Sequence, residues 1–134
     1  ASGNAVRWNS KDVKMIYTAG YRALACLENV VHRSSRGLQE NFRTLLIEIP
    51  ENLKIGIINK TDLLGNWRDY ASIPYTQKFG DKWVRSKTSP VLQVPSAIIP
   101  QEFNYLLNPL HKDFHKIKLI NTESFEFDGR LKAD

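Results

Sequence analysis

The sequence contains several short, β-prone apolar runs and only two stretches with helical spacing, and this balance most constrains the fold. Leu45, Ile47 and Ile49 alternate with their neighbours up to Pro50, as expected for a half-buried strand. Further strand-like runs lie at residues 15–18, 55–58, 91–94, 97–99, 117–120 and 125–127. We therefore predict an α+β domain with a small mixed β-sheet core and a few helices, rather than a doubly wound sheet.

The two helical stretches are expected at residues 20 to about 33 and at residues 75–87. In the first stretch, Leu24, Leu27 and Val31 recur at helical spacing. These three residues define the apolar arc with which this helix is expected to face the core.

Two further segments are not assigned to a single helix or strand. Residues 59–74 are predicted to form a long loop or a short helix. Residues 90–100 form an apolar run that Pro95 interrupts. Because central positions of a ladder reject proline, we expect an edge, a bulge or a kink at Pro95.

Length and composition point to one domain. The chain has 134 residues, of which 42% are hydrophobic, enough for a core without disulfides. Its single cysteine, Cys26, excludes an intrachain disulfide framework and a cysteine-based zinc ribbon. No apolar run approaches the roughly 20 residues of a membrane-spanning helix, and the first residues lack the pattern of a secretory signal. We therefore expect a cytoplasmic domain with no membrane association.

The charge balance favours anionic ligands. Lysine and arginine number 19 and aspartate and glutamate 14, which gives a formal net charge of +5. The basic residues are scattered in ones and twos, whereas a dedicated nucleic-acid-binding domain usually concentrates them on one element. We therefore expect no direct contact with nucleic acid, and a small basic nucleic-acid-binding module remains the third-ranked alternative.

Several common catalytic motifs are absent from the sequence. The glycines form neither a G-x-G-x-x-G fingerprint nor a phosphate loop, and there is no G-x-S-x-G elbow. His111 and His115 have the spacing of two metal ligands on one helix face. Because Pro109 lies just upstream and no third ligand can be assigned, we interpret this segment as a solvated basic turn without a metal.

Glu28 occupies an unusual position for a carboxylate. At about 100° per residue it lies roughly 40° from Leu24, at the edge of the apolar arc. Burying a carboxylate there costs several kcal/mol unless it is paired or hydrogen-bonded. Glu28 either satisfies a core arginine or backbone amides, or it is held in a cleft to face a developing positive charge.

Three more residues are candidates for the same site. Arg7 lies between apolar neighbours and beside Trp8, and either binds phosphate oxygens or forms a surface ion pair. Tyr17, near the end of a strand, either stacks on a planar cation or fills the core. Ser96 stands where an apolar strand would favour valine, and either serves the site or bonds the backbone at a bulge.

Together, these four side chains suit one chemistry, the cleavage of an N-glycosidic bond in a dinucleotide whose base carries positive charge. The arginine would hold the diphosphate, and the tyrosine would stack on the base. The glutamate would stabilise the oxocarbenium-like sugar that forms as the base leaves.

The order and spacing of several short motifs resemble the RES domain, a family named for its Arg, Glu and Ser. The first motifs are Arg7-Trp8-Asn9, Tyr17-Thr18-Ala19, Ala23-Leu24-Ala25, Leu27-Glu28 and Val31-His32. The later motifs are Gly80-Asp81-Lys82-Trp83, Val94-Pro95-Ser96, Glu102, Asn104-Tyr105-Leu106-Leu107-Asn108-Pro109, Phe125, Phe127-Asp128 and Arg130-Leu131. The resemblance covers about residues 5–131, so we expect a single RES-like domain across residues 1–134.

This resemblance implies a toxin of a bacterial toxin–antitoxin pair, related in fold to ADP-ribosyltransferases, that depletes cellular NAD. Glu28 and Ser96 match the family's catalytic Glu and Ser, and Arg7 and Tyr17 match its substrate-binding residues. NAD would be the substrate, with no metal and no separate cofactor. The implied partner is a helix-turn-helix antitoxin of the Xre type on a separate chain. The oligomeric state stays open, with a homodimer among the alternatives.

The chain departs from the family pattern in two places. Family members usually carry a further segment, with another arginine, before the Arg-Trp-Asn motif, whereas six residues precede Arg7 here. The family often has His-Pro-Asp where this chain has His111-Lys112-Asp113. The resemblance leaves open whether water or phosphate accepts the ribosyl group, and ADP-ribosyl transfer to a macromolecule is the main alternative.

Overall fold

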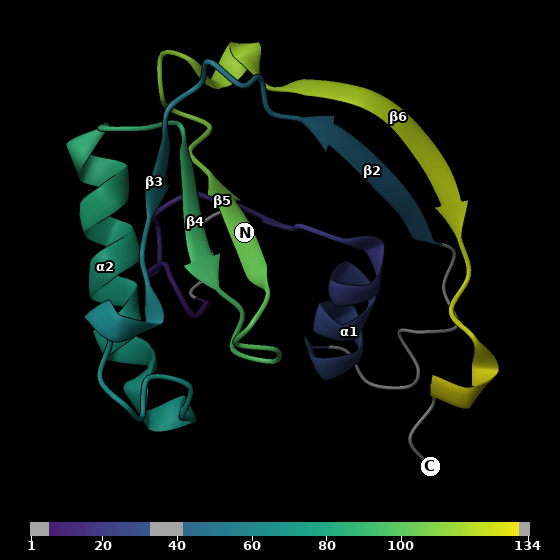
Figure 1. Cartoon of the computed structure of the whole chain (residues 1–134), viewed down its shortest axis with the longest axis horizontal. Helices are drawn as coiled ribbons and strands as arrows, with labels where there is room; N and C mark the ends of the chain where they lie inside the picture. Colours follow the sequence, from purple (N-terminus) through teal and green to yellow (C-terminus); the bar gives the residue numbers. More distant parts are fainter. Residues whose placement is uncertain (1–5, 33–41, 132–134) are drawn as a thin grey trace.

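The computed structural model describes residues 6–32 and 42–131, which form an α+β domain as predicted (Figure 1). The strands are β1 (Ile16–Ala19), β2 (Phe42–Glu48), β3 (Ile55–Ile57), β4 (Val91–Pro95), β5 (Phe103–Leu107) and β6 (Lys118–Phe125). The two α-helices are α1 (Arg22–His32) and α2 (Ile73–Ser86). In this described part of the chain, no helix is long and apolar enough to cross a membrane.

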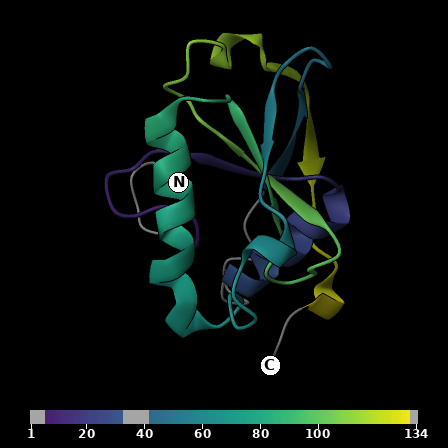
Figure 2. The ribbon, with the colours of Figure 1, turned by 60° about the vertical axis from the view of Figure 1, so that its left-hand side comes forward.

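The strands form two separate sheets. The main sheet has the order β1-β5-β4-β3, in which β3 and β4 are parallel and the other neighbours antiparallel, so it is mixed as predicted. Strands β2 and β6 form an antiparallel pair of their own. Figure 1 shows α2 on one side of the main sheet and the curved β2–β6 pair on the other, and Figure 2 shows the same layers from a second direction.

The two faces of the main sheet carry separate cores. Leu92 pairs with Leu106, and Val91 pairs with Leu107, so the members of each pair share a face. The first pair belongs to a buried cluster with Trp8, Met15, Leu63, Trp67, Trp83 and Val94. The second pair packs with Leu53 and with partly buried Ile47, Ile49, Tyr105, Phe114 and Ile117.

Helix α1 confirms the first helical stretch, but its apolar arc is shorter than predicted. Leu24 is fully buried, whereas Val31 is 59% exposed. One turn before Val31, Glu28 already contacts Ser96, the residue that follows β4. The last turn of α1 therefore lies beyond the end of the sheet, which explains the exposure of Val31. The helix end predicted near residue 33 falls outside the described residues.

The β2–β6 pair differs from the prediction in two ways. The register shifts between Leu46 and Ile47, where β6 carries one extra residue, Ile120. Leu45 is 56% exposed, although Ile47 packs inward as predicted. The runs predicted at residues 117–120 and 125–127 are not two strands, because one continuous strand, β6, pairs along the whole of β2.

The expected edge is found at Pro95, whereas the run after it differs from expectation. Pro95 is the last residue of β4, an interior strand, but β3 pairs with β4 only as far as Gln93. Pro95 therefore has an open edge on that side, and no ladder bond is lost. Residues 97–99 bend away instead of continuing as a strand, and residues 59–74 contain two 3₁₀ turns, Lys60–Asp62 and Tyr70–Ser72.

Helix α2 and the N-terminal segment meet at Gly80. A Cβ atom added to Gly80 would lie 1.7 Å from the carbonyl oxygen of Trp8. Neither backbone can move aside easily, because Trp8 is itself buried in the main cluster. Glycine is therefore required here for close approach of two backbones.

We expect Gly80→Ala to lower the free energy of unfolding by about 3 kcal/mol or more, because overpacking against backbone cannot be relieved by a side-chain rotation. Urea denaturation followed by tryptophan fluorescence measures this change. Gly65→Ala is the matched control, since nothing lies within 4 Å of the added Cβ, and it should change stability by less than about 0.5 kcal/mol. Equal midpoints for the two variants would contradict the close-contact interpretation.

Candidate active site

One face of α2 holds the segment that carries Arg7. Thr76 and Gly80 lie about one turn apart and therefore share a helix face, and Asp81 directly follows Gly80. The Thr76 hydroxyl donates to the Arg7 carbonyl oxygen at 2.6 Å. The buried Asp81 carboxylate accepts the backbone N–H of Ser10 at 2.9 Å and also its hydroxyl. The Gly-Asp pair of the motif Gly80-Asp81-Lys82-Trp83 thus helps to fix the backbone around Arg7.

Arg7 is half-buried and oriented by backbone carbonyls. Its Nη1 donates to the Trp67 carbonyl oxygen at 3.0 Å and its Nη2 to that of Arg68 at 3.2 Å. Burial lowers the pKa of Arg7 from its usual value, and the charge of Glu28 opposes this shift while the charge of Arg68 adds to it. Glu28 and Arg68 therefore both lie within electrostatic reach of Arg7.

Tyr17 connects the main sheet to the same N-terminal segment. Its hydroxyl donates to Asn9 Oδ1 at 2.6 Å and accepts the backbone N–H of Trp8 at 3.0 Å. Burial raises the pKa of Tyr17 above its ordinary value, and the bond from Trp8 only partly opposes this. Both hydrogen bonds engage the hydroxyl, so contact with a ligand would involve the ring of Tyr17. One part of this ring packs against the buried cluster.

Two neutral donors hold the carboxylate of Glu28. Ser96 Oγ donates to Glu28 Oε1 at 3.1 Å, and Asn104 Nδ2 donates to the same oxygen at 2.9 Å. Ser96 is fully buried, and its Oγ accepts the backbone N–H groups of Ile98 and Ile99, each at 3.1 Å. With one bond donated and two accepted, the hydroxyl is saturated. This geometry favours Ser96 as a positioning residue rather than one that touches substrate.

Strand register explains why these groups meet. Tyr17 pairs with Leu106, whose side chain faces the α2 side, and Asn104 lies two residues from Leu106 on the same face. Val94 pairs with Asn104, and Ser96 continues this alternation just past the end of β4. The α2 face of the sheet therefore ends in Asn104 and Ser96, where α1 brings in its carboxylate.

The four predicted residues thus lie in two connected groups. Tyr17 bonds Trp8 and Asn9, the two residues that follow Arg7, and Glu28 bonds Ser96. Electrostatic interaction between Arg7 and Glu28 joins the groups.

Sequence reasoning assigned no role to Asn104 or Arg68, which the structure places at this site. Asn104 carried a usable signal, because it lies two residues before Leu106 in a strand and so shares its face. Arg68 lies in an irregular segment, and no periodic pattern could have placed it.

His111 and His115 both form hydrogen bonds with backbone groups. His111 Nδ1 accepts the backbone N–H of Asp113 at 3.0 Å, so the proton is on Nε2, which bonds the Lys87 carbonyl oxygen at 3.0 Å. His111 is buried, so a solvated turn is the wrong description for it, although His115 is exposed as predicted. Among residues 6–32 and 42–131, no group of three or more His, Cys, Asp or Glu side chains could hold a metal ion.

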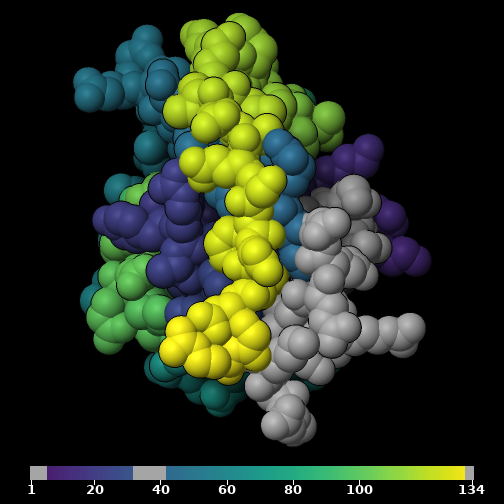
Figure 3. All heavy atoms as spheres, turned by 90° about the vertical axis from the view of Figure 1, so that its right-hand side faces the viewer, coloured from purple at the N-terminus to yellow at the C-terminus, as the bar shows by residue number. Residues whose placement is uncertain are grey.

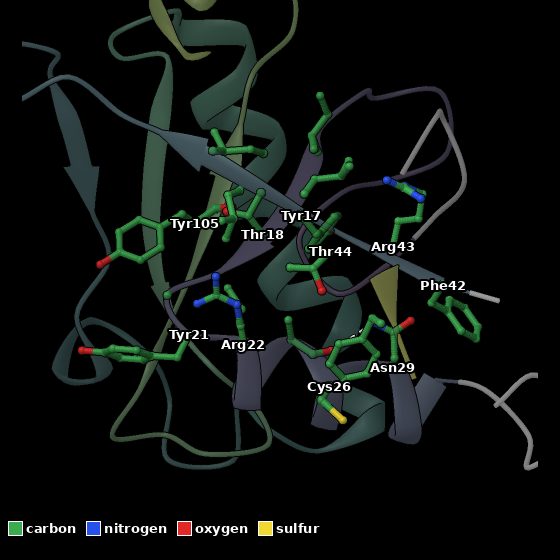
Figure 4. Close-up of a pocket in the computed structure, with 18 of the residues that line it drawn as sticks. Tyr17, Thr18, Tyr21, Arg22, Cys26, Asn29, Phe42, Arg43, Thr44 and Tyr105 are labelled. Atoms are coloured by element: carbon green, nitrogen blue, oxygen red, sulfur yellow. Dashed lines mark hydrogen bonds between the residues drawn. The ribbon is translucent and has the colours of Figure 1, made fainter. Parts of the chain in front are cut away.

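A cavity of about 600 Å³ lies on the other side of the main sheet (Figure 4). Helix α1 and strands β1 and β2 form its walls, and its lining includes Tyr17, Thr18, Arg22, Cys26, Asn29 and Arg43. Of the four predicted site residues only Tyr17 lines it. Figure 3 shows α1 and β6 side by side on this face of the molecule. The cavity therefore shares Tyr17 with the site but is not lined by Arg7, Glu28 or Ser96.

The structure is an α+β domain in which the hydrogen-bonded carboxylate of Glu28 interacts electrostatically with Arg7, whose guanidinium two backbone carbonyls orient. The sequence matches the RES domain family over residues 1–128. The chain therefore belongs to the RES-domain family.

Curated relatives agree with this assignment. A protein named Toxin Res from Yersinia enterocolitica is 39% identical over 127 residues, which cover 94% of this chain and 83% of that protein. A Toxin Res from Photorhabdus laumondii is 38% identical over 126 residues, 93% of this chain and 80% of that protein. The Prs ADP-ribosylating toxin of a Sphingobium species is 36% identical over 127 residues, 93% of this chain and 79% of that protein.

We expect the burial of Tyr17 to appear as a pH dependence of stability. Because its pKa is raised in the folded state, the free energy of unfolding should fall as the pH rises above about 10, where an unfolded tyrosine ionises. Urea denaturation at pH values on both sides of 10 measures the slope. Tyr17→Phe should have a shallower slope, whereas Tyr70→Phe, at an 87% exposed position, should keep that of the wild type. A slope unchanged by Tyr17→Phe would contradict the assignment.

Proposed function

We propose that this chain is a NAD-consuming toxin that cleaves the bond between nicotinamide and ribose. The observation that carries the proposal is the Glu28 carboxylate, which Ser96 and Asn104 orient and which interacts electrostatically with Arg7. The names of the relatives, Toxin Res and ADP-ribosylating toxin, support the same class.

In this reaction, the C1′–N bond breaks and both of its electrons stay with the ring nitrogen, so nicotinamide leaves as a neutral base. Positive charge then develops on the ribose, and the Glu28 carboxylate stabilises it. Water or phosphate adds to C1′, and a water nucleophile loses one proton to solvent. The first route gives ADP-ribose and the second gives its 1-phosphorylated form.

The other side chains bind and position in this proposal. Arg7 holds the diphosphate by charge-assisted hydrogen bonds. The face of the Tyr17 ring suits the cationic nicotinamide ring, while its hydroxyl maintains the N-terminal segment. Ser96 and Asn104 are neutral donors, so they fix the carboxylate without cancelling its charge. Burying these groups is consistent with preorganised electrostatic stabilisation.

We expect Glu28→Gln to lower the rate of nicotinamide release from NAD by about 100-fold or more, since it removes the charge that opposes the ribosyl cation. Chromatography of free nicotinamide measures the rate. Glu51→Gln, at an exposed position in a turn, is the matched control and should match the wild type. Equal rates for the wild type and Glu28→Gln would disprove the assignment of Glu28, and no release by the wild type would disprove the activity.

ADP-ribosyl transfer to a macromolecule is the second candidate, which the name of the Sphingobium relative favours. Transfer and hydrolysis share the departure of nicotinamide and differ in the group that attacks C1′. NAD labelled in its adenylate part discriminates them in a lysate. Label fixed on a protein band supports transfer, whereas label found only in small molecules supports hydrolysis or phosphorolysis.

An antitoxin partner follows from this activity, because an enzyme that depletes NAD must be neutralised in its own cell. We propose a helix-turn-helix protein of the Xre type, with acidic or terminal residues that enter the positive region near Arg7. Expression of the wild-type chain should arrest growth, and co-expression of the antitoxin should restore growth and co-purify with the chain. Growth arrest that survives in Glu28→Gln would contradict NAD loss as the cause.

A further inference from the structure

We propose that Arg68 is a second anion-binding residue of this site and that it clamps the diphosphate of the dinucleotide together with Arg7. The identity of the ligand rests on the proposed function, whereas the pairing of the two arginines rests on contacts within the chain.

The backbone of Arg68 lies next to the Arg7 guanidinium. The Arg68 carbonyl oxygen accepts a hydrogen bond from Arg7 Nη2 at 3.2 Å. From this point the Arg68 side chain reaches the residues after β4, where Nε donates to the Ala97 carbonyl oxygen at 2.8 Å and Nη2 to that of Ile98 at 3.3 Å. Two backbone carbonyls therefore orient each guanidinium group, and the backbone of Arg68 connects the two sets of contacts.

The charges of these two arginines are not balanced by ion pairs. Within the described residues, no carboxylate lies within 4 Å of either guanidinium. The positive charge of Arg68 contributes to the lowered pKa of Arg7, although the charge of Glu28 opposes this shift more strongly. By contrast, ion pairs with carboxylates are formed by Arg22, Arg85 and Arg130. Two guanidinium groups that no carboxylate contacts directly favour an anionic ligand.

Both guanidinium groups retain donors for such a ligand. Each has five N–H groups and uses two of them on backbone carbonyls. Arg68 is exposed and Arg7 is half-buried, so a ligand can approach from the Arg68 side. A diphosphate linkage carries one negative charge on each phosphate, which matches two guanidinium groups better than one.

The same contacts connect the anion end of the site to the carboxylate. The carbonyls that Arg68 binds belong to Ala97 and Ile98, and the N–H groups of Ile98 and Ile99 bind Ser96 Oγ. Ser96 in turn donates to the Glu28 carboxylate. One turn therefore carries the bonds that orient both the second guanidinium and the carboxylate.

The competing interpretation is that Arg68 only braces this turn. If Arg68 only braces the turn, its replacement should lower stability and displace Glu28. If Arg68 binds phosphate, its replacement should weaken the binding of a ligand that contains phosphate. A binding measurement that involves no bond cleavage separates the two interpretations.

The first experiment measures binding of ADP-ribose, which has the diphosphate but no nicotinamide, by calorimetry. Arg68→Gln should weaken binding by about tenfold or more, and Arg68→Lys, which keeps a point charge, should lose less. Arg130→Gln is the matched control, because Arg130 pairs with Asp128 at the surface and is 91% exposed. It should bind within about twofold of the wild type. In turnover of NAD, Arg68→Gln should raise KM more than it lowers kcat.

A second measurement uses the wild-type chain and does not depend on the folding of a variant. Phenylglyoxal modifies accessible arginines, and ADP-ribose should protect Arg68 and Arg7 but not Arg130. Inorganic pyrophosphate should give the same protection, whereas nicotinamide should give none. Modification of Arg68 that is unchanged by ADP-ribose would overturn the proposal.

The outcomes distinguish this proposal from the proposed function. If the wild type binds ADP-ribose through Arg68 but releases no nicotinamide from NAD, the cleavage activity fails and the clamp stands. If it cleaves NAD and Arg68→Gln leaves both KM and ADP-ribose affinity unchanged, the clamp fails and the activity stands. If the wild type neither binds ADP-ribose nor cleaves NAD, both are overturned.

Discussion

The close approach between α2 and the N-terminal segment is the constraint on which the site depends. Gly80 permits the Trp8 carbonyl to lie against the helix backbone, where any side chain would collide. Asp81 and Thr76 then hold the residues on either side of Trp8 by hydrogen bonds. Because these contacts are largely buried, the backbone of Arg7 has one position, and its guanidinium starts from a fixed point.

The electrostatic arrangement of the site is asymmetric in a way that suits a substrate with charges of both signs. At one end, the Glu28 carboxylate receives two hydrogen bonds from neutral donors. At the other end, two guanidinium groups are oriented by carbonyls instead of carboxylates. Neutral hydrogen-bond partners fix the positions of these charged groups, and fixed charges are what preorganised electrostatic stabilisation of a ligand requires.

The regular elements were largely predictable from the sequence because they depend on local periodicity. The spacing of Leu24 and Leu27 predicts α1, and the alternation around Ile47 predicts β2. The errors arose where a distant segment overrides that periodicity. Val31 is exposed because the sheet ends before the last turn of α1, and Leu45 is exposed in the pair that β2 forms with β6.

The residues of the candidate site show the same division. Arg7, Tyr17, Glu28 and Ser96 could be selected from the sequence because each is polar or aromatic where its neighbours are apolar, and because their motifs resemble the RES domain. That the saturated hydroxyl of Ser96 holds the carboxylate could not be deduced in this way. Their hydrogen bond spans 68 positions of the chain.

The sequence by itself determined the class of the fold, the family and the set of chemical groups, because these follow from local pattern and residue type. Only the tertiary structure decided which groups meet. Asn104 reaches Glu28 through strand register, and Arg68 reaches Arg7 through an irregular segment that has no repeating pattern. Contacts between distant segments depend on how the packed elements are placed against one another, and no local preference of the chain encodes that placement.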